Sequence, residues 1–179
     1  MLTITTNIGI IILFHIVSLF FISGVAKLTS FKQFLQYVEA FNVLPARIAT
    51  LFGMLVPFLE LSGAVFLLIE HTRFYGAVIL GFLLMTFIYA IIQALRSGEQ
   101  ISCGCYGRLF DAKVSSFTLG KAAYLFVLII ILTIYPSLFN GEYSASYLVM
   151  GVFLTLLLLV TEKIWHIHAQ TLEHLRNLK

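Results

Sequence analysis

Charged residues are scarce in this chain of 179 residues: Asp, Glu, Lys and Arg together make up 11% of it. A soluble domain of this length carries roughly a quarter charged residues, so the low charge argues against an ordinary water-soluble protein, and the distribution of the apolar residues is the test. The chain is instead 60% apolar, with a mean hydropathy of +1.02. Its apolar residues fall in blocks of about twenty, each long enough to cross the ~30 Å hydrocarbon layer of a bilayer. The sequence therefore predicts an integral membrane protein.

The apolar blocks are continuous, which favours α-helices over the strands of a membrane barrel, since those strands alternate in polarity over ~10 residues. We predict an all-α fold with one membrane domain over residues 1–179. Five transmembrane helices are expected at 7–26, 48–69, 74–95, 122–139 and 146–164. A loop over 96–121 separates the third helix from the fourth, and a polar tail over 165–179 follows the fifth.

The first apolar run has no basic segment before it and no small-residue cleavage site after it. We therefore expect it to stay as a helix and not to be removed as a signal peptide. Gly24, Gly63, Gly76 and Gly81 lie within or beside the predicted helices. Small residues let helix backbones approach closely in a membrane, so we expect these glycines at helix contacts.

The Lys and Arg residues lie almost entirely on one side of the predicted spans. All of them except Arg73 fall in or beside the segments 27–47, 96–121 and 163–179, which share that side. Because Lys and Arg are enriched in cytoplasmic loops, we predict an external N-terminus, with the C-terminus and the 96–121 loop in the cytoplasm. Basic residues at membrane boundaries attract anionic lipid headgroups, so the lipid bilayer accounts for the net charge of +3 without nucleic acid as a partner.

Segment 28–44 has the pattern of an amphipathic helix lying on the bilayer surface. Its apolar residues recur at helical spacing, at positions 31, 34, 35, 38 and 41. Ser30 followed by Gln33 fits a capping box at the start of this interfacial helix. A docking helix for a partner protein is the alternative interpretation.

Cysteine is almost absent, and the two cysteines of the chain, Cys103 and Cys105, are separated by a single glycine. A disulfide closed over so short a ring is strained and easily reduced. It would also remove little chain entropy, which argues against a structural role. Basic residues in the same loop favour the thiolate form, which is the nucleophile. The pattern indicates a catalytic pair that cycles between dithiol and disulfide.

Two other interpretations of the pair stay open. The two thiolates could bind a soft metal such as Cu(I) or Zn(II), with His166 and His168 completing the ligand shell. Alternatively, Cys103 and Cys105 are small packing residues of a tight turn, without chemistry. The catalytic interpretation requires no metal.

Glu60 falls near the centre of the second predicted helix, three residues after Pro57. A charge at that depth costs a few kcal/mol, so the carboxylate should be neutral, paired or directed into a polar cavity. One interpretation makes Glu60 a proton-handling or quinone-polarising group, with His15 as a second candidate for cofactor binding. The other is an interhelical hydrogen bond to a polar residue of a neighbouring helix, for which the candidates are His15, Ser18, Thr86 and Tyr89.

Four segments follow one another along the chain: FISGVAK at 21–27, FNVLP at 41–45, PFLELSG at 57–63 and CGCYG at 103–107. Taken in this order, they resemble the MauE (methylamine utilisation) family of the DoxX-like superfamily, and the resemblance extends from about residue 14 to about residue 135. The usual cysteine motif of the family has Phe where this chain has Tyr106. The resemblance implies a four-helix transmembrane bundle plus a fifth helix in a bacterial plasma membrane. It also implies thiol–disulfide chemistry at Cys103 and Cys105 with a thioredoxin-like partner, as in the maturation of disulfide-rich methylamine dehydrogenase. Lys27 and Glu60 are positions of the family pattern without an assigned role.

The first functional hypothesis is therefore a membrane thiol–disulfide oxidoreductase or redox maturation factor, with a membrane quinone as the candidate cofactor. The alternatives are a quinone-linked oxidoreductase of small sulfur compounds and a non-enzymatic copper or zinc carrier or membrane scaffold. Oxidative maturation takes place outside the cytoplasm, whereas the charge asymmetry places the cysteine loop inside. Either the topology is inverted, or a quinone or a cytoplasmic thiol system is the exchange partner. The sequence leaves the oligomeric state open.

Overall fold

The structure is a computed structural model that describes residues 2–41, 45–97, 115–141 and 143–177. These residues form helices and turns without a strand, and five of the helices are long and apolar enough to cross a membrane. The long helices are α1 (Leu2–Thr29), α3 (Ala46–Leu68), α4 (Arg73–Ser97), α5 (Ser116–Ile134) and α6 (Ala145–Asn177). Three short helices join them: α2 (Phe31–Ala40), η1 (Glu70–Thr72) and η3 (Pro136–Phe139). The predicted all-α membrane fold is confirmed.

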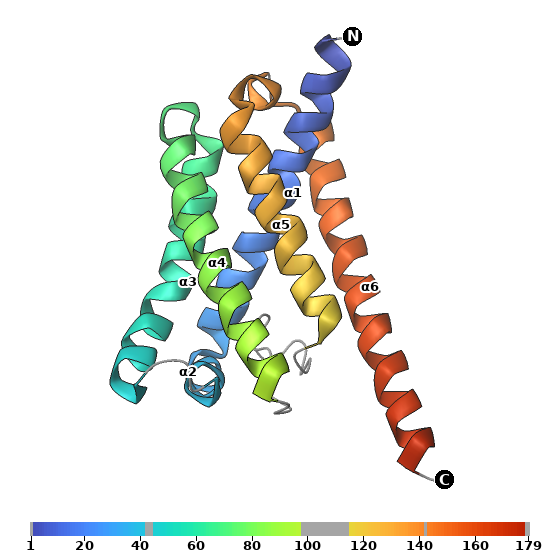
Figure 1. Ribbon diagram of the computed structural model, residues 1–179. Coiled ribbons are helices and arrows are strands. Elements are labelled where there is room, and N and C mark those ends of the chain that lie inside the picture. Colours follow the sequence, from blue (N-terminus) through green and yellow to red (C-terminus); the bar gives the residue numbers. More distant parts are fainter. Residues whose placement is uncertain (1, 42–44, 98–114, 142, 178–179) are drawn as a thin grey trace.

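The long helices run alternately up and down, so the connections gather at two ends of the molecule (Figure 1). The N-terminus, η1 and η3 lie at one end, here called the η1 end; α2 and the C-terminal ends of α4 and α6 lie at the other, the α2 end. Helix α1 packs against α3 and α6, and α3, α4 and α5 pack side by side in chain order. The result is a bundle of α1, α3, α4 and α5, with α6 added against α1.

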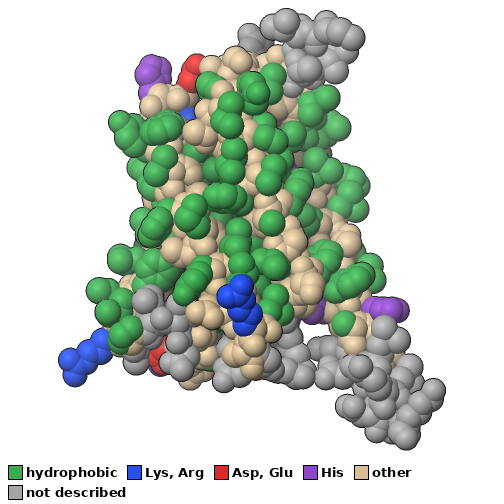
Figure 2. Space-filling view, in the orientation of Figure 1, with side chains coloured by type: hydrophobic (Ala, Val, Ile, Leu, Met, Phe, Trp, Pro, Cys, Tyr) green, Lys and Arg blue, Asp and Glu red, His purple; other side chains and the backbone are tan. Residues whose placement is uncertain are grey.

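Large apolar side chains cover the outside of the bundle (Figure 2). One example from each long helix, in chain order, is Phe21, Phe58, Phe82, Val127 and Phe153, and these are 50–59% exposed. Contiguous apolar surface of this extent is rare on soluble monomers, because water penalises it. Lipid tails impose no such penalty, so this surface suits a multi-pass membrane protein.

Helix α5 begins and ends earlier than the range of 122–139 that the apolar pattern predicts. Its N-terminal cap is Ser115, whose side-chain oxygen accepts a hydrogen bond from the backbone N–H of Thr118 at 3.4 Å. The helix ends before Pro136, since proline has no N–H to donate and disfavours helical backbone at the preceding residue. Lys121, expected in the loop at the membrane boundary, consequently lies inside α5 and is buried.

Helix α6 continues to Asn177, through most of the segment that the sequence predicts as a polar tail. No glycine or proline occurs after Gly151. Polar side chains mark the end of an apolar run, but they do not end a helix.

The interfacial helix α2 is shorter than the predicted range of 28–44, and the predicted capping box is wrong. Helix α1 extends to Thr29, so the hydroxyl of Ser30 donates to the backbone carbonyl of Ala26 at 2.8 Å and does not cap α2. The side chain of Gln33 donates to the hydroxyl of Tyr37. Helix α2 packs against α3.

Close helix approach at the glycines is confirmed at three of the four predicted positions. A Cβ atom on Gly76 would lie 2.8 Å from the backbone oxygen of Gly63, and Cβ atoms on Gly24 and Gly63 would also meet neighbours within 3.0 Å. Gly81 faces α5 less closely, since the nearest atom to a Cβ there would be a methyl group of Ile129 at an ordinary 3.7 Å. The α3–α4 hairpin is therefore the tightest of these contacts between backbones.

Arg73 ties the η1 end together and is only 4% exposed. Its guanidinium donates to the carbonyl of Leu67 at 3.0 Å, to the carbonyl of Phe139 at 3.2 Å and to the side-chain oxygen of Asn140. It also donates to the hydroxyl of Tyr143 at 2.6 Å. The basic residue that the sequence places opposite all the others is thus a buried clamp between the α3–α4 turn and the η3 segment.

Candidate functional site

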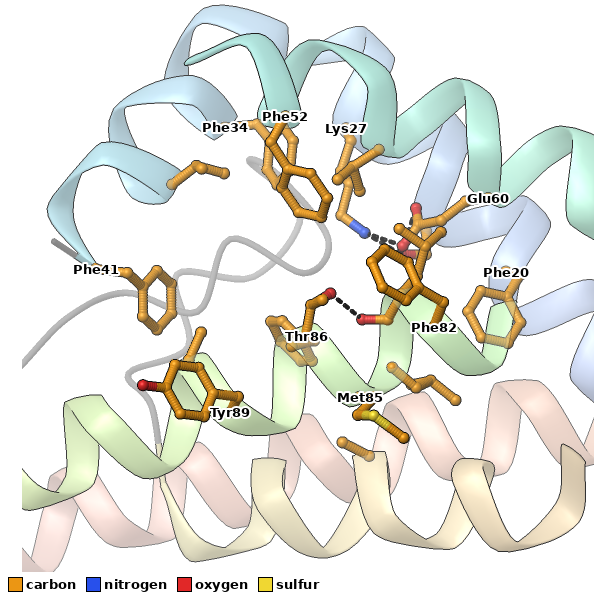
Figure 3. A pocket seen from close by; sticks show the side chains of 18 of the residues that line it. Phe20, Lys27, Phe34, Phe41, Phe52, Glu60, Phe82, Met85, Thr86 and Tyr89 are labelled. Atoms are coloured by element: carbon orange, nitrogen blue, oxygen red, sulfur yellow. Dashed lines mark hydrogen bonds and ion pairs between the residues drawn. The ribbon is translucent and has the colours of Figure 1, made fainter. Parts of the chain in front are cut away.

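Lys27 of α1 and Glu60 of α3 form an ion pair inside the bundle, and each side chain is 8% exposed (Figure 3). Ser23, one turn before Lys27 on α1, accepts a hydrogen bond from the ammonium group at 2.8 Å. The Ser23 hydroxyl in turn lies 3.3 Å from Glu60 Oε2, to which it can donate. The carboxylate is therefore paired and hydrogen-bonded, as a charge in the membrane interior requires.

The hydrogen-bond partners that the sequence suggests for Glu60 are wrong. His15 Nδ1 lies 3.0 Å from the hydroxyl of Thr155 on α6, and the hydroxyl of Thr86 donates to a backbone carbonyl of its own helix. Neither Ser18 nor Tyr89 bonds the carboxylate. Lys27 ends an apolar run and is expected from sequence at the membrane boundary, whereas the flexible lysine stem lets its ammonium group reach the carboxylate on α3.

A second buried ion pair joins α5 to α6. Lys121 Nζ donates to Glu162 Oε1 at 2.6 Å, and the two side chains are 6% and 4% exposed. Close by in the sequence, the rings of Phe117 and Trp165 stack with centroids 5.7 Å apart. Glu162 is a site residue that the sequence did not single out. Its spacing from Thr155, however, is the helical spacing that places two polar side chains on one face of α6.

A cavity of about 630 Å³ lies between α1, α2, α3, α4 and α5, in the half of the bundle that carries α2 (Figure 3). Of its described lining residues, Lys27, Glu60 and Lys121 are charged. The remaining lining residues are mostly apolar, and their aromatic members include Phe34, Phe41, Phe52, Phe82 and Tyr89. A cavity of this size, apolar with a few polar groups directed into it, has the character of a small-molecule site.

The arrangement suits a ligand with an apolar body and an oxygen-bearing headgroup. The ammonium groups of Lys27 and Lys121 are hydrogen-bond donors with no acceptor capacity, and Glu60 is an acceptor when ionised. The aromatic walls offer stacking contacts to a flat ring. His15 does not line this cavity, so the structure separates the two residues that the sequence suggests for cofactor binding.

Cys103 and Cys105 lie in segment 98–114, outside the described residues. His166 is half-buried and His168 is exposed on α6. Within the part of the chain that the structure describes, no three His, Cys, Asp or Glu side chains come together as a metal site. The redox role of the cysteine pair and its alternative metal role both stay predictions.

The sequence profile of a family described as "Methylamine utilisation protein MauE" matches residues 5–135, well over half of the chain. The chain belongs to the MauE family. Curated proteins named "Methylamine utilization protein MauE" are among its relatives. The protein of Methylophilus methylotrophus is 34% identical over 87 residues, which cover 48% of this chain and 46% of that protein. The protein of Paracoccus denitrificans is 33% identical over 89 residues, or 49% of this chain and 48% of its own length.

A third MauE protein, from Methylorubrum extorquens, is 29% identical over 102 residues, or 56% of this chain and 55% of that protein. The chain thus aligns with about half the length of these curated MauE proteins. No solved structure shows a significant match. Membership of the wider DoxX-like superfamily stays a prediction.

The MauE match includes Lys27, Glu60 and Lys121, and it ends before α6. The region that defines the family therefore contains the charged residues of the cavity wall. Glu162, the partner of Lys121, lies beyond it.

Proposed function

We propose that this MauE-family protein is a redox component of methylamine utilisation in a bacterial plasma membrane. In this proposal, Cys103 and Cys105 exchange a disulfide with a thioredoxin-like partner, and a lipid-soluble quinone in the cavity re-oxidises the pair. The observation that carries the proposal is an apolar cavity inside the bundle with the Lys27–Glu60 ion pair and Lys121 on its wall.

The two half-cycles balance in electrons and protons. A dithiol partner reduces the Cys103–Cys105 disulfide through a mixed disulfide, which leaves the partner oxidised and both cysteines as thiols. The two thiols then close again to a disulfide and give up two electrons and two protons. The quinone accepts two electrons and two protons and leaves as quinol.

The cavity supports the quinone half of this cycle through its chemistry. A quinone carries two carbonyl oxygens on a flat ring, and negative charge develops on these oxygens as electrons arrive. Lys27 and Lys121 can donate hydrogen bonds to these oxygens and stabilise that charge, in surroundings where water is scarce and electrostatic interactions are strong. Aromatic side chains such as Phe52 and Phe82 supply faces for the ring.

The chain connections support contact between the cysteine segment and the cavity. Helix α4 is described to Ser97 and α5 begins at Ser116, and both of these points lie at the α2 end, where the cavity also lies. Cys103 follows Ser97 by six residues, which reach at most ~20 Å when extended. The tether is therefore long enough for the pair to meet a ligand bound near Tyr89.

The charge distribution supports a cytoplasmic position for the α2 end. Lys32, Arg47, Arg96 and Lys163 are all exposed in this half of the molecule. Among the described residues, no Lys or Arg is exposed at the η1 end, where Arg73 is buried. This asymmetry follows the positive-inside rule, so a thiol partner on the cytoplasmic side fits the proposal.

Single-cysteine variants test the thiol half of the proposal. Removing the resolving cysteine should trap a mixed disulfide with the partner, because the intermediate then has no second thiol to release it. We expect one of Cys103→Ser and Cys105→Ser to accumulate such an adduct on non-reducing gels of membranes. The double variant is the matched control and should accumulate none. Absence of an adduct from both single variants would refute the exchange mechanism.

Purified protein in liposomes tests the quinone half. Dithiothreitol should reduce decylubiquinone faster in the presence of the intact protein than in the presence of the double cysteine variant. Acceleration by thiosulfate in place of the dithiol would instead support a quinone-linked oxidoreductase of small sulfur compounds. Stoichiometric copper or zinc that is lost in Cys103→Ser would support a metal carrier.

A further inference from the structure

Two buried polar atoms on α6 lack a hydrogen bond to any described residue: Glu162 Oε2 and His166 Nε2. Glu162 is only 3% exposed, and its other oxygen accepts a hydrogen bond from Lys121. Unsatisfied buried polar atoms are costly, so each one calls for a physical explanation. Their spacing of four residues places both side chains on one face of the helix, within reach of each other or of one bridging water.

These side chains form a series that leads from the α2 end to the cavity. His166 is half-buried, Glu162 is buried, and Lys121 lines the cavity wall. Lys121 forms its ion pair with Glu162, and His166 follows Glu162 by about one turn of α6. All three side chains can gain and lose protons.

The Lys27–Glu60 ion pair differs from the Lys121–Glu162 pair in the hydrogen bonds of its carboxylate. Both oxygens of Glu60 lie within hydrogen-bond distance of the Ser23 hydroxyl, and Oε1 also pairs with Lys27. Glu60 thus has no oxygen without a partner, whereas Glu162 keeps one. An ion pair whose carboxylate oxygens all have partners, such as Lys27–Glu60, can position a ligand. A carboxylate with one vacant oxygen, such as that of Glu162, can take up a proton from one neighbour and pass it to another.

We infer that His166, Glu162 and Lys121 conduct protons from the aqueous phase at the α2 end to a quinone bound in the cavity. This inference rests on the proposed function, since quinone reduction is the step that consumes protons inside the bundle. Lys121 donates a proton to the reduced quinone oxygen and regains one from Glu162, which is reloaded through His166. Two such transfers accompany the two electrons that the dithiol gives up.

The direction of the route makes the overall reaction electrically neutral. The thiols release two protons as they close to a disulfide, and the quinone takes up two. Both the cysteine segment and His166 connect to the α2 end, so no net charge crosses the bilayer. The reaction would therefore run without opposing or using a membrane potential.

His166 is the residue at which the inference is best tested, because its removal leaves the Lys121–Glu162 ion pair intact. Full-length His166→Ala protein in liposomes should reduce decylubiquinone with dithiothreitol at least about tenfold more slowly, since lost proton transfer typically costs that much or more. Its rate should also fall more steeply with rising pH than that of the unaltered protein. Imidazole added to the buffer should restore part of the rate. His168→Ala is the matched control, because His168 is exposed on the same helix.

Glu162→Asp and Glu162→Gln extend the test to the buried member. The aspartate variant retains an ionisable group and should keep more activity than the glutamine variant. If His166→Ala matches His168→Ala at every pH, the proton route is refuted while the proposed function stands. If the unaltered protein does not reduce quinone at all, the quinone half of the proposed function falls and the route falls with it.

Discussion

The Lys27–Glu60 ion pair allows a quantitative test of the bundle interior. The perturbation is to neutralise one partner at a time, as Lys27→Met or Glu60→Gln, and then both together. Each side chain is 8% exposed, so either single change leaves a charge that is buried and uncompensated. Breaking a buried pair in this way costs about 3–5 kcal/mol of folding free energy. That cost lowers the folding equilibrium constant by about two to three and a half powers of ten.

The double variant should recover most of that loss, because it leaves no charge without a partner. The two single effects should therefore add up to far more than the effect of the double variant. Lys32→Met is the matched control, since Lys32 is an exposed lysine of the neighbouring helix α2 and should change stability by no more than about 0.5 kcal/mol.

The assay is reversible unfolding in mixed detergent micelles, followed by the loss of helical circular dichroism as the denaturing detergent increases. A complete cycle of four proteins gives the interaction energy between the two sites. If each single variant lies within about 1 kcal/mol of the unaltered protein, as an exposed pair would, then the pair is not shielded from water and the reasoning is refuted.

Three further predictions concern helix packing, the η1 end and sidedness. Gly76→Ala should lower the unfolding midpoint by the equivalent of about 1–3 kcal/mol, because the added methyl group meets backbone atoms at 2.8 Å. Gly120→Ala is the matched control: it has no neighbour within 4 Å and should not lower the midpoint, since alanine favours a helix over glycine. Arg73→Gln should loosen the η3 segment, seen as faster proteolysis there than in the unaltered protein, since the clamp to Tyr143 and its neighbours is lost. A membrane-impermeant maleimide should label reduced Cys103 in inside-out vesicles but not in intact cells, and the opposite result would invert the proposed orientation.

The fold class could be predicted from sequence because a bilayer imposes one dominant rule. A chain crossing the hydrocarbon layer must satisfy its backbone groups within each segment, so a continuous apolar run of sufficient length indicates a helix. The ends of those helices depend on local chemistry that hydropathy does not register. The serine cap at the start of α5 and the continuation of α6 past its apolar part are the clearest cases.

The candidate site was predictable only in part. A carboxylate at the position of Glu60 stands out because its cost in a membrane demands compensation. Its partner does not stand out, since Lys27 ends an apolar run, where a lysine ordinarily faces lipid headgroups. Lys121 and Glu162 were missed for the same reason, and their pairing depends on how α5 and α6 approach each other. The roles of Cys103 and Cys105 rest on sequence alone.

The order of the buried charges along the chain has a consequence for biosynthesis. Lys27 precedes Glu60 by 33 residues, and Lys121 precedes Glu162 by 41, so in both pairs the cation is translated long before its counter-ion. Burying an unmatched lysine in the bundle is costly, so we expect α1 to take its final place only after α3 has emerged, and α5 only after α6 has emerged. A chain cut short after η3 would lack Glu162, the carboxylate that Lys121 meets in the complete bundle. Helix α6 is thus needed before α5 can bury Lys121 in its final place, although α6 is not one of the four helices of the bundle.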